Sequence, residues 1–168
     1  ARAEALRYRG YAFEQVLLSR ADRLGRFARS RLYVLLTTAL CKGDPLVTAH
    51  AALAGGADCI QLREKTLGDR PLLDLARRLR EVTARAGALL IVNDRPDIAL
   101  LADADGVHVG QDDLPVGAVR TVLGGDRLVG LSTHSVDQAR RAVEAGADHI
   151  GIGPMFATAT KDAGPVQG

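Results

Sequence analysis

Acidic side chains follow two successive apolar runs in the middle of the chain. Asn93 and Asp94 come directly after the run at 88–92, and Asp113 follows the next short run, at 105–109. If these runs are neighbouring strands of a parallel barrel, their carboxyl ends open onto one rim, and the two carboxylates can lie close together. Two carboxylates beside an amide suit a hard cation such as Mg²⁺, which completes its shell with substrate phosphates. The pattern therefore predicts a magnesium site.

Cationic and polar side chains stand at the ends of other apolar runs. Ammonium and guanidinium groups bind phosphate oxygens through charge-assisted hydrogen bonds, and amides and hydroxyls add neutral donors. The cations are Arg63, Lys65 and Lys161, and the neutral groups are Gln61, Asn93, Ser132, Thr158 and Thr160. With the two aspartates, this set predicts a magnesium–diphosphate site.

Each of these residues also has a simpler interpretation. The pairs at 93–94 and 112–113 could cap helices, because Pro96 and Pro115 follow them as typical first-turn residues. Arg63 and Lys65 could be ordinary surface charges, and His108 and His134 could be polar residues satisfied near strand ends. For single positions these alternatives stay open, and only the convergence of polar groups at five consecutive strand ends favours a site.

Six apolar runs are candidate strands: 32–37, 58–62, 88–92, 105–109, 127–131 and 148–153. They are almost continuously apolar, which is typical of parallel strands buried on both faces. Helical stretches separate them. The clearest is 68–87, where Pro71 suits a first helical turn and Gly87 a stop.

A weak internal repeat indicates the architecture. ALAGGADCIQL, ALLADADGVHV and AVEAGADHIGI each place an Ala-Asp pair before an apolar strand, with the aspartates at 58, 105 and 148. Compact repeating βα units with short loops favour an α/β fold of the (β/α)₈ TIM-barrel type over an open doubly wound sheet. We expect a barrel truncated after strand 6. The three aspartates precede their strands, so we expect turn roles at the N-terminal face, away from catalysis.

The N-terminal residues predict an amphipathic helix over 2–29. Leu6, Phe13, Leu17, Leu24 and Phe27 form one helical stripe, which we expect to pack on the main domain or on a missing N-terminal neighbour. The chain is thus divided into a helical extension, 1–30, and a partial barrel domain, 31–168. Residues 1–31 hold eight arginines against three acids, but no nucleic-acid motif, so a solvated basic helix face is expected rather than nucleic-acid binding.

Composition narrows the class of protein. At 168 residues with 47% hydrophobic content, the chain can form one domain with a sizeable core. No apolar run approaches the ~18 residues of a membrane span, and no secretory signal is visible. Cys41 and Cys59 form no disulfide framework, and Cys59 suits a small buried position in a strand. These features favour a cytoplasmic protein.

Five motifs, taken in order, resemble the thiamine-phosphate synthase family over residues 31–168. They are QLREK, VNDR, DGVHVGQDD-P, G-S-H and GIGP-F-T-TK. The resemblance implies a (β/α)₈ barrel that uses Mg²⁺ to join 4-amino-2-methyl-5-hydroxymethylpyrimidine diphosphate to 4-methyl-5-(2-phosphoethyl)thiazole. The products are thiamine phosphate and diphosphate. It also implies dissociative chemistry, in which diphosphate leaves before the thiazole nitrogen attacks.

The resemblance assigns roles to individual residues. Asp94 and Asp113 would bind Mg²⁺, and Lys65, Ser132 and Lys161 would be catalytic. The pyrimidine diphosphate would be held by Gln61, Arg63, Lys65, Asn93, Ser132 and Lys161, and the thiazole phosphate by Thr158, Ala159 and Thr160.

Two other functions are compatible with a barrel of this kind. A thiazole tautomerase would isomerise a thiazole phosphate without metal or diphosphate, and would not need Asp94, Asp113 and Lys65 together. A degenerate barrel would bind ligands without catalysis. We expect the substrates as the partners, with assembly into a homo-oligomer left open, and we expect residues 1–168 to be inactive alone because barrel closure needs eight strands.

Overall fold

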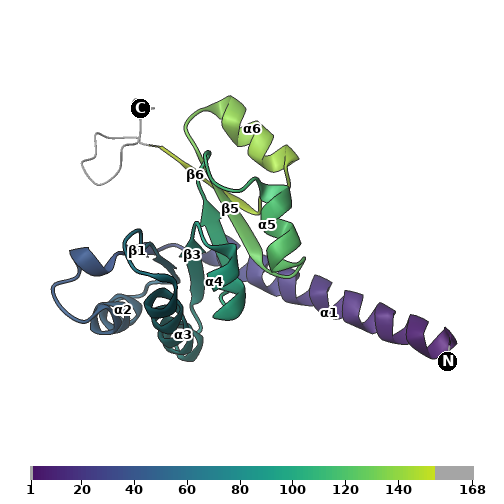
Figure 1. Cartoon of the computed structure of the whole chain (residues 1–168), viewed down its shortest axis with the longest axis horizontal. Coiled ribbons are helices and arrows are strands. Elements are labelled where there is room, and N and C mark those ends of the chain that lie inside the picture. The colour runs from purple at the N-terminus through teal and green to yellow at the C-terminus, as the bar shows by residue number, and fades with distance from the viewer. Residues whose placement is uncertain (1, 154–168) are drawn as a thin grey trace.

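The computed structural model describes residues 2–153, with side chains from Gly10 onward. Six parallel strands form one sheet in the order β1-β2-β3-β4-β5-β6 (Figure 1). The strands are β1 (Tyr33–Leu36), β2 (Cys59–Leu62), β3 (Leu89–Asn93), β4 (Gly106–Val109), β5 (Leu128–Thr133) and β6 (His149–Ile152). Neighbours in sequence are therefore neighbours in space, as consecutive βα units of a barrel require.

Helices connect the strands and cover one face of the sheet. They are η1 (Thr38–Leu40), α2 (Pro45–Ala54), α3 (Asp69–Arg85), α4 (Pro96–Leu101), α5 (Val116–Leu123) and α6 (Val136–Glu144). α3 ends where the sequence indicated, since Gly87 follows it with φ +69°, a conformation that glycine adopts at little cost.

The core has two layers because successive strand residues point to opposite faces. In β3, Leu90 and Val92 join the large cluster under the helices, whereas Leu89 and Ile91 face the other side. That second cluster also contains Cys59, buried as expected. We call this second cluster, formed by Cys59, Leu89, Ile91 and Leu128, the inner cluster, because it lines the region that a barrel would enclose.

Two strands extend beyond their predicted ends, and β1 and β6 each end one residue before theirs. β5 extends to Thr133, two residues beyond the predicted end, so Ser132 belongs to the strand rather than to the loop after it. Asn93 is likewise the last residue of β3. The prediction ended both strands at the last apolar residue. Backbone pairing with the neighbouring strand nevertheless continues through the polar residues that follow.

The N-terminal helix α1 (Arg2–Arg29) runs past one end of the sheet and projects beyond the domain (Figure 1). Leu24 and Phe27 pack against the inner cluster. Phe13 and Leu17, by contrast, are 66% and 51% exposed. The stripe therefore packs on the main domain only over its inner half, and the side chain of Leu6 lies outside the described residues.

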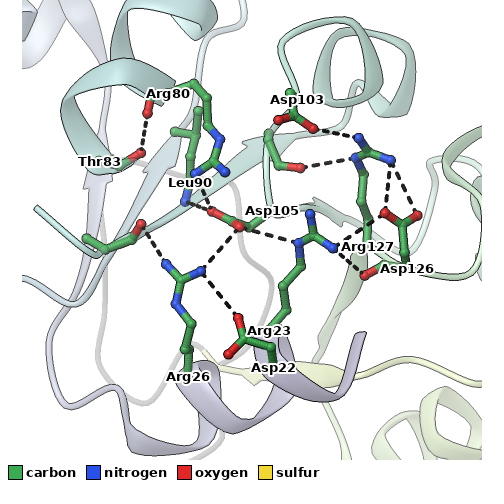
Figure 2. A network of polar contacts seen from close by, with 12 residues as sticks. Asp22, Arg23, Arg26, Arg80, Thr83, Leu90, Asp103, Asp105, Asp126 and Arg127 are labelled. Atoms are coloured by element: carbon green, nitrogen blue, oxygen red, sulfur yellow. Dashed lines mark hydrogen bonds and ion pairs between the residues drawn. The ribbon is translucent and has the colours of Figure 1, made fainter. Parts of the chain in front are cut away.

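Arginines of α1 bind the N-terminal end of the sheet. Arg20 pairs with Asp148 at 2.7 Å, and Arg23 approaches Asp105 at 3.4 Å. Figure 2 shows Asp105 among Arg23, Arg26 and the α3 residue Arg80. The prediction of a purely solvated basic face is wrong for these arginines of α1. Their partners Asp105 and Asp148 lie 79 to 128 positions away in sequence, so the helix pattern could not identify them.

The repeat aspartates act as turn residues, as expected from their place before the strands. Asp58 accepts a hydrogen bond from the amide of Leu32 at 3.0 Å, and Asp105 accepts one from Leu90 at 2.9 Å. Asp148 does the same for Val129 at 2.7 Å. Each carboxylate thus fixes the start of a neighbouring strand. Within residues 2–153, no helix is both long and apolar enough to cross a membrane.

Candidate active site

A cavity of about 430 Å³ lies over the inner face of the sheet. Backbone register explains why its polar lining converges, because Asn93 pairs with His108, His108 with Gly130, and Gly130 with His149 across four adjacent strands. The cavity is lined by Phe27, Tyr33, Leu35, Gln61, Arg63, Asn93, His108, Ser132, His149, Ile150 and Gly151. Four residues predicted for the site therefore share one cavity: Gln61, Arg63, Asn93 and Ser132.

The structure brings Asp94 and Asp113 together at the rim, as the sequence predicted. Burial raises the pKa of Asp94, and hydrogen bonding and charge repulsion from Asp113 raise it further, while Lys65 lowers it. Asp94 has φ +60°, a left-handed conformation uncommon outside glycine, asparagine and aspartate. Its backbone amide donates to the carbonyl of His108 at 2.8 Å, which holds this turn against the next strand.

The helix-capping interpretation is wrong for both pairs, 93–94 and 112–113. The N-cap of α4 is Arg95 and that of α5 is Pro115, and neither helix start receives a side-chain capping bond. Asp113 instead accepts a hydrogen bond from the amide of Gly110 at 2.7 Å, within its own loop. The carboxylates of Asp94 and Asp113 are thus not used to start helices.

This donor set fits a divalent cation. The charge of Asp113 raises the pKa of Asp94, and a cation bound beside both carboxylates would relieve that repulsion; oxygen ligands are those that Mg²⁺ prefers. No group of three or more histidine, cysteine or acidic side chains suitable for a metal occurs among residues 2–153. A cation at Asp94 and Asp113 would therefore depend on substrate oxygens and water for the rest of its shell.

Lys65 lies beside the predicted metal ligands. Its Nζ is 3.5 Å from Oδ2 of Asp94, and its side chain is 59% exposed. The lysine therefore remains accessible to an anion that approaches the carboxylates from solvent. Arg63, two residues earlier, lines the cavity itself.

Gln61 is buried within the inner face of the sheet. Its Nε2 donates to the hydroxyl of Tyr33 at 2.9 Å. Burial raises the pKa of Tyr33, so the phenol stays neutral near pH 7. This pair presents a fixed neutral polar surface to the cavity.

Ser132 belongs to a hydrogen-bonded row. Its Oγ lies 3.0 Å from Nε2 of His108, and Nδ1 of His108 lies 3.2 Å from Nε2 of His149. Gln111 holds the Ser132 backbone by donating to its carbonyl at 2.6 Å. His134, the other histidine near this strand end, contacts the carbonyl of Gly153 through Nδ1 at 2.5 Å, as expected for a satisfied polar residue.

The remaining predicted residues, Thr158, Ala159, Thr160 and Lys161, lie outside the described residues. Among the residues that line the cavity, sequence reasoning missed the aromatic residues Phe27 and Tyr33 and the imidazole of His149. Strand alternation offered a signal for His149, because a polar residue inside an apolar strand often faces an enclosed polar site. Phe27 had no such signal, because it reaches the cavity from α1.

Comparison with known proteins places the chain in a family. The sequence profile described as thiamine monophosphate synthase matches residues 32–168. Thiamine-phosphate synthase of Moorella thermoacetica is 53% identical over 135 residues, which cover 79% of this chain and 64% of that protein. Thiamine-phosphate synthase of Gloeobacter violaceus is 45% identical over 161 residues, or 96% of this chain and 46% of that protein, so this match includes most of α1.

A solved structure agrees with the sequence matches. Thiamine phosphate pyrophosphorylase from Pyrococcus furiosus superposes with a TM-score of 0.72 at 36% identity, covering 76% of this chain and 62% of that one. The chain thus spans a little under two thirds of the Moorella and Pyrococcus proteins and about half of the Gloeobacter protein. From its cavity, its motifs and these matches, the chain belongs to the thiamine monophosphate synthase family.

Proposed function

We propose that the protein is a thiamine-phosphate synthase, which joins a hydroxymethylpyrimidine diphosphate to a thiazole phosphate and releases diphosphate. The observation that carries this proposal is the contact of Lys65 with Asp94 beside Asp113. A cation next to two carboxylates suits a magnesium diphosphate, and the cavity of about 430 Å³ that the neighbouring Arg63 and Asn93 line suits a small aromatic ring.

The diphosphate group of the substrate would bind at the rim, and its aromatic ring would enter the cavity. Asp94 and Asp113 would hold Mg²⁺, which when bound neutralises charge on the diphosphate and makes it a better leaving group. Lys65 and Arg63 bind the diphosphate oxygens from the other side. Asn93, which lines the cavity below, orients the part of the substrate that carries the ring, and the Ser132 hydroxyl binds a diphosphate oxygen.

The reaction needs no general base among these residues. The carbon–oxygen bond to the diphosphate breaks, and its electron pair leaves with the diphosphate beside Lys65. The thiazole nitrogen then supplies its own lone pair to the exposed carbon, so no proton has to be removed. The role of the protein is to stabilise the departing charge and to exclude water from the electron-poor carbon. Leu35 and Ile150 supply apolar lining for that purpose.

We further propose that strands β1–β6 are the first six of a (β/α)₈ barrel. Their consecutive order and parallel pairing support this, as does the inner cluster. The second phosphate would bind at 158–160, with Lys161 on the diphosphate, as the motif GIGP-F-T-TK implies.

The test is an assay of the full-length protein with both substrates and Mg²⁺. We expect thiamine phosphate and inorganic diphosphate in equal amounts, with no product when Mg²⁺ is chelated. The variant Lys161→Gln should lower turnover far more than it raises the KM for the thiazole phosphate. Metal-independent isomerisation of a thiazole phosphate, without diphosphate release, would instead establish the tautomerase alternative.

A further inference from the structure

The cavity floor holds a row of three hydrogen-bonding side chains whose hydrogen positions can be deduced. Ser132 Oγ contacts His108 Nε2, and His108 Nδ1 contacts His149 Nε2. The two histidines come from β4 and β6 and flank Gly130 of β5, with which both are in register. A Cβ at Gly130 would lie 2.1 Å from His149 Nε2 and 2.4 Å from His108 Nδ1, so only glycine leaves room for this contact.

The nitrogen of His149 that faces away from His108, Nδ1, determines which atom donates in each hydrogen bond of the row. Its Nδ1 is shut off from solvent and has no hydrogen-bond partner among the described residues. A neutral imidazole carries its hydrogen on Nδ1 or on Nε2, and a protonated one carries hydrogens on both. Buried N–H groups without an acceptor are rarer in proteins than acceptors without a donor. Only the neutral form with hydrogen on Nε2 avoids a buried, unpaired N–H at Nδ1.

Two further features keep the imidazole of His149 neutral. Phe27 of α1 stacks on the imidazole, with ring centroids 4.3 Å apart and planes 29° apart, which covers the ring with apolar surface. Burial lowers the pKa of His149 to about 3, and the neighbouring His108 lowers it as well, against an opposing effect of Asp148. The ring is therefore neutral at physiological pH.

From this geometry we infer that His149 and His108 are positioning residues that turn the Ser132 hydroxyl into a hydrogen-bond donor toward the cavity. His149 Nε2–H donates to His108 Nδ1, so the hydrogen of neutral His108 lies on Nε2. His108 Nε2–H then donates to Ser132 Oγ. Because this lone pair of Ser132 is occupied, its own O–H points to the cavity.

The direction in which these hydrogen bonds are donated decides whether Ser132 offers the cavity a donor or an acceptor. If the row ran the other way, Ser132 would donate to His108 and would present only lone pairs to the cavity. A diphosphate oxygen is an acceptor and would be repelled by those lone pairs. The inferred direction instead supplies a neutral donor for it. This consequence rests on the proposed function, whereas the hydrogen positions rest on the geometry alone.

The first experiment measures the tautomers directly. The full-length protein is labelled with ¹⁵N-histidine, and two-bond ¹H–¹⁵N correlation spectra are recorded at neutral pH, with the exposed His50 as internal reference. Substitution of His108 and of His149, one at a time, assigns their signals. We expect both residues to be neutral with hydrogen on Nε2. Hydrogen on Nδ1 of either residue, or a charged His149, would overturn the inference.

The second experiment compares two substitutions of His149. In His149→Gln the amide nitrogen can replace the Nε2 donor, whereas His149→Phe keeps an aromatic ring against Phe27 but has no donor. We expect the affinity for inorganic diphosphate with Mg²⁺, measured by calorimetry, to stay within about twofold for His149→Gln and to fall about five- to tenfold for His149→Phe. His108 should lose its single tautomer only in His149→Phe.

The outcomes separate the two hypotheses. Equal losses of affinity in both variants, at equal unfolding midpoints, would refute the donor role of His149. If His149→Phe does not fold, the spectra of the unsubstituted protein still decide the direction of the row. A protein with the expected tautomers that binds no diphosphate would contradict the proposed function and leave the histidine arrangement standing.

Discussion

Lys65 and Asp94 form an ion pair just beyond the carboxyl ends of β2 and β3, with 3.5 Å between Nζ and Oδ2. The pair joins two groups that the sequence assigned to different tasks, a cation for diphosphate and a carboxylate for metal. Without a bound metal, the lysine compensates part of the repulsion between Asp94 and Asp113. If Asp94 and Asp113 hold Mg²⁺ as proposed, the ammonium group of Lys65 would be free to bind the diphosphate.

Asp94→Asn and Asp113→Asn should each weaken Mg²⁺ binding by roughly tenfold or more, since each removes one of two carboxylate ligands. Asparagine is the appropriate replacement at 94 because it tolerates the positive φ there, so the charge is removed without straining the turn. Calorimetric titration with Mg²⁺ and diphosphate provides the measurement. Asp112→Asn, an exposed neighbour, is the matched control and should leave the affinity unchanged.

The affinity for Mg²⁺ should fall as the pH is lowered through the raised pKa of Asp94, because the protonated carboxyl no longer binds the cation. Lys65→Met should move this fall to higher pH, since Lys65 is the group that lowers that pKa. It should also weaken diphosphate binding by about tenfold. Arg85→Met, at the exposed end of α3, controls for the lost charge. An unchanged pH dependence in Lys65→Met would contradict the assigned coupling.

Asp105→Asn should destabilise the protein by about 3 kcal/mol or more, because removal of one buried charge leaves its partners uncompensated. Asp105 is only 1% exposed and faces Arg23, Arg26 and Arg80 (Figure 2). Urea unfolding gives the free energy of unfolding. Asp137→Asn, which removes an exposed pair with Arg140, should cost less than about 1 kcal/mol. Similar costs for both substitutions would mean that the Asp105 network contributes little.

Asp148→Asn should change how stability responds to acid. Burial alone would raise the pKa of Asp148, but hydrogen bonds from Arg20, the Val129 amide and Arg120 outweigh it and lower the pKa. A lowered pKa stabilises the folded protein above the unfolded-state value of about 3.9, and this contribution is lost as the pH falls through the folded-state value. The difference in unfolding free energy between the parent and Asp148→Asn should therefore be largest near pH 7 and shrink below about pH 4. A constant difference would show that Asp148 titrates normally.

The sequence by itself determined the order of the elements and the chemistry of the rim. Continuous apolar runs and short connections are local signals, and they located all six strands, with β3 and β5 each ending beyond the apolar run. A parallel sheet places every strand end on one side, so the positions of Asp94 and Asp113 in the chain sufficed to predict that they meet. The motifs identified the family because they combine these residues in one order.

The tertiary structure decided what depends on distant partners. The arginines of α1 and the aspartates at 105 and 148 are separated by 79 to 128 residues, so helical periodicity could not distinguish an anchored face from a solvated one. The same holds for Phe27, which stacks on His149 across 122 positions of sequence. Strand register brought His108, Gly130 and His149 into one row, and that register is fixed by backbone pairing rather than by the type of any single residue.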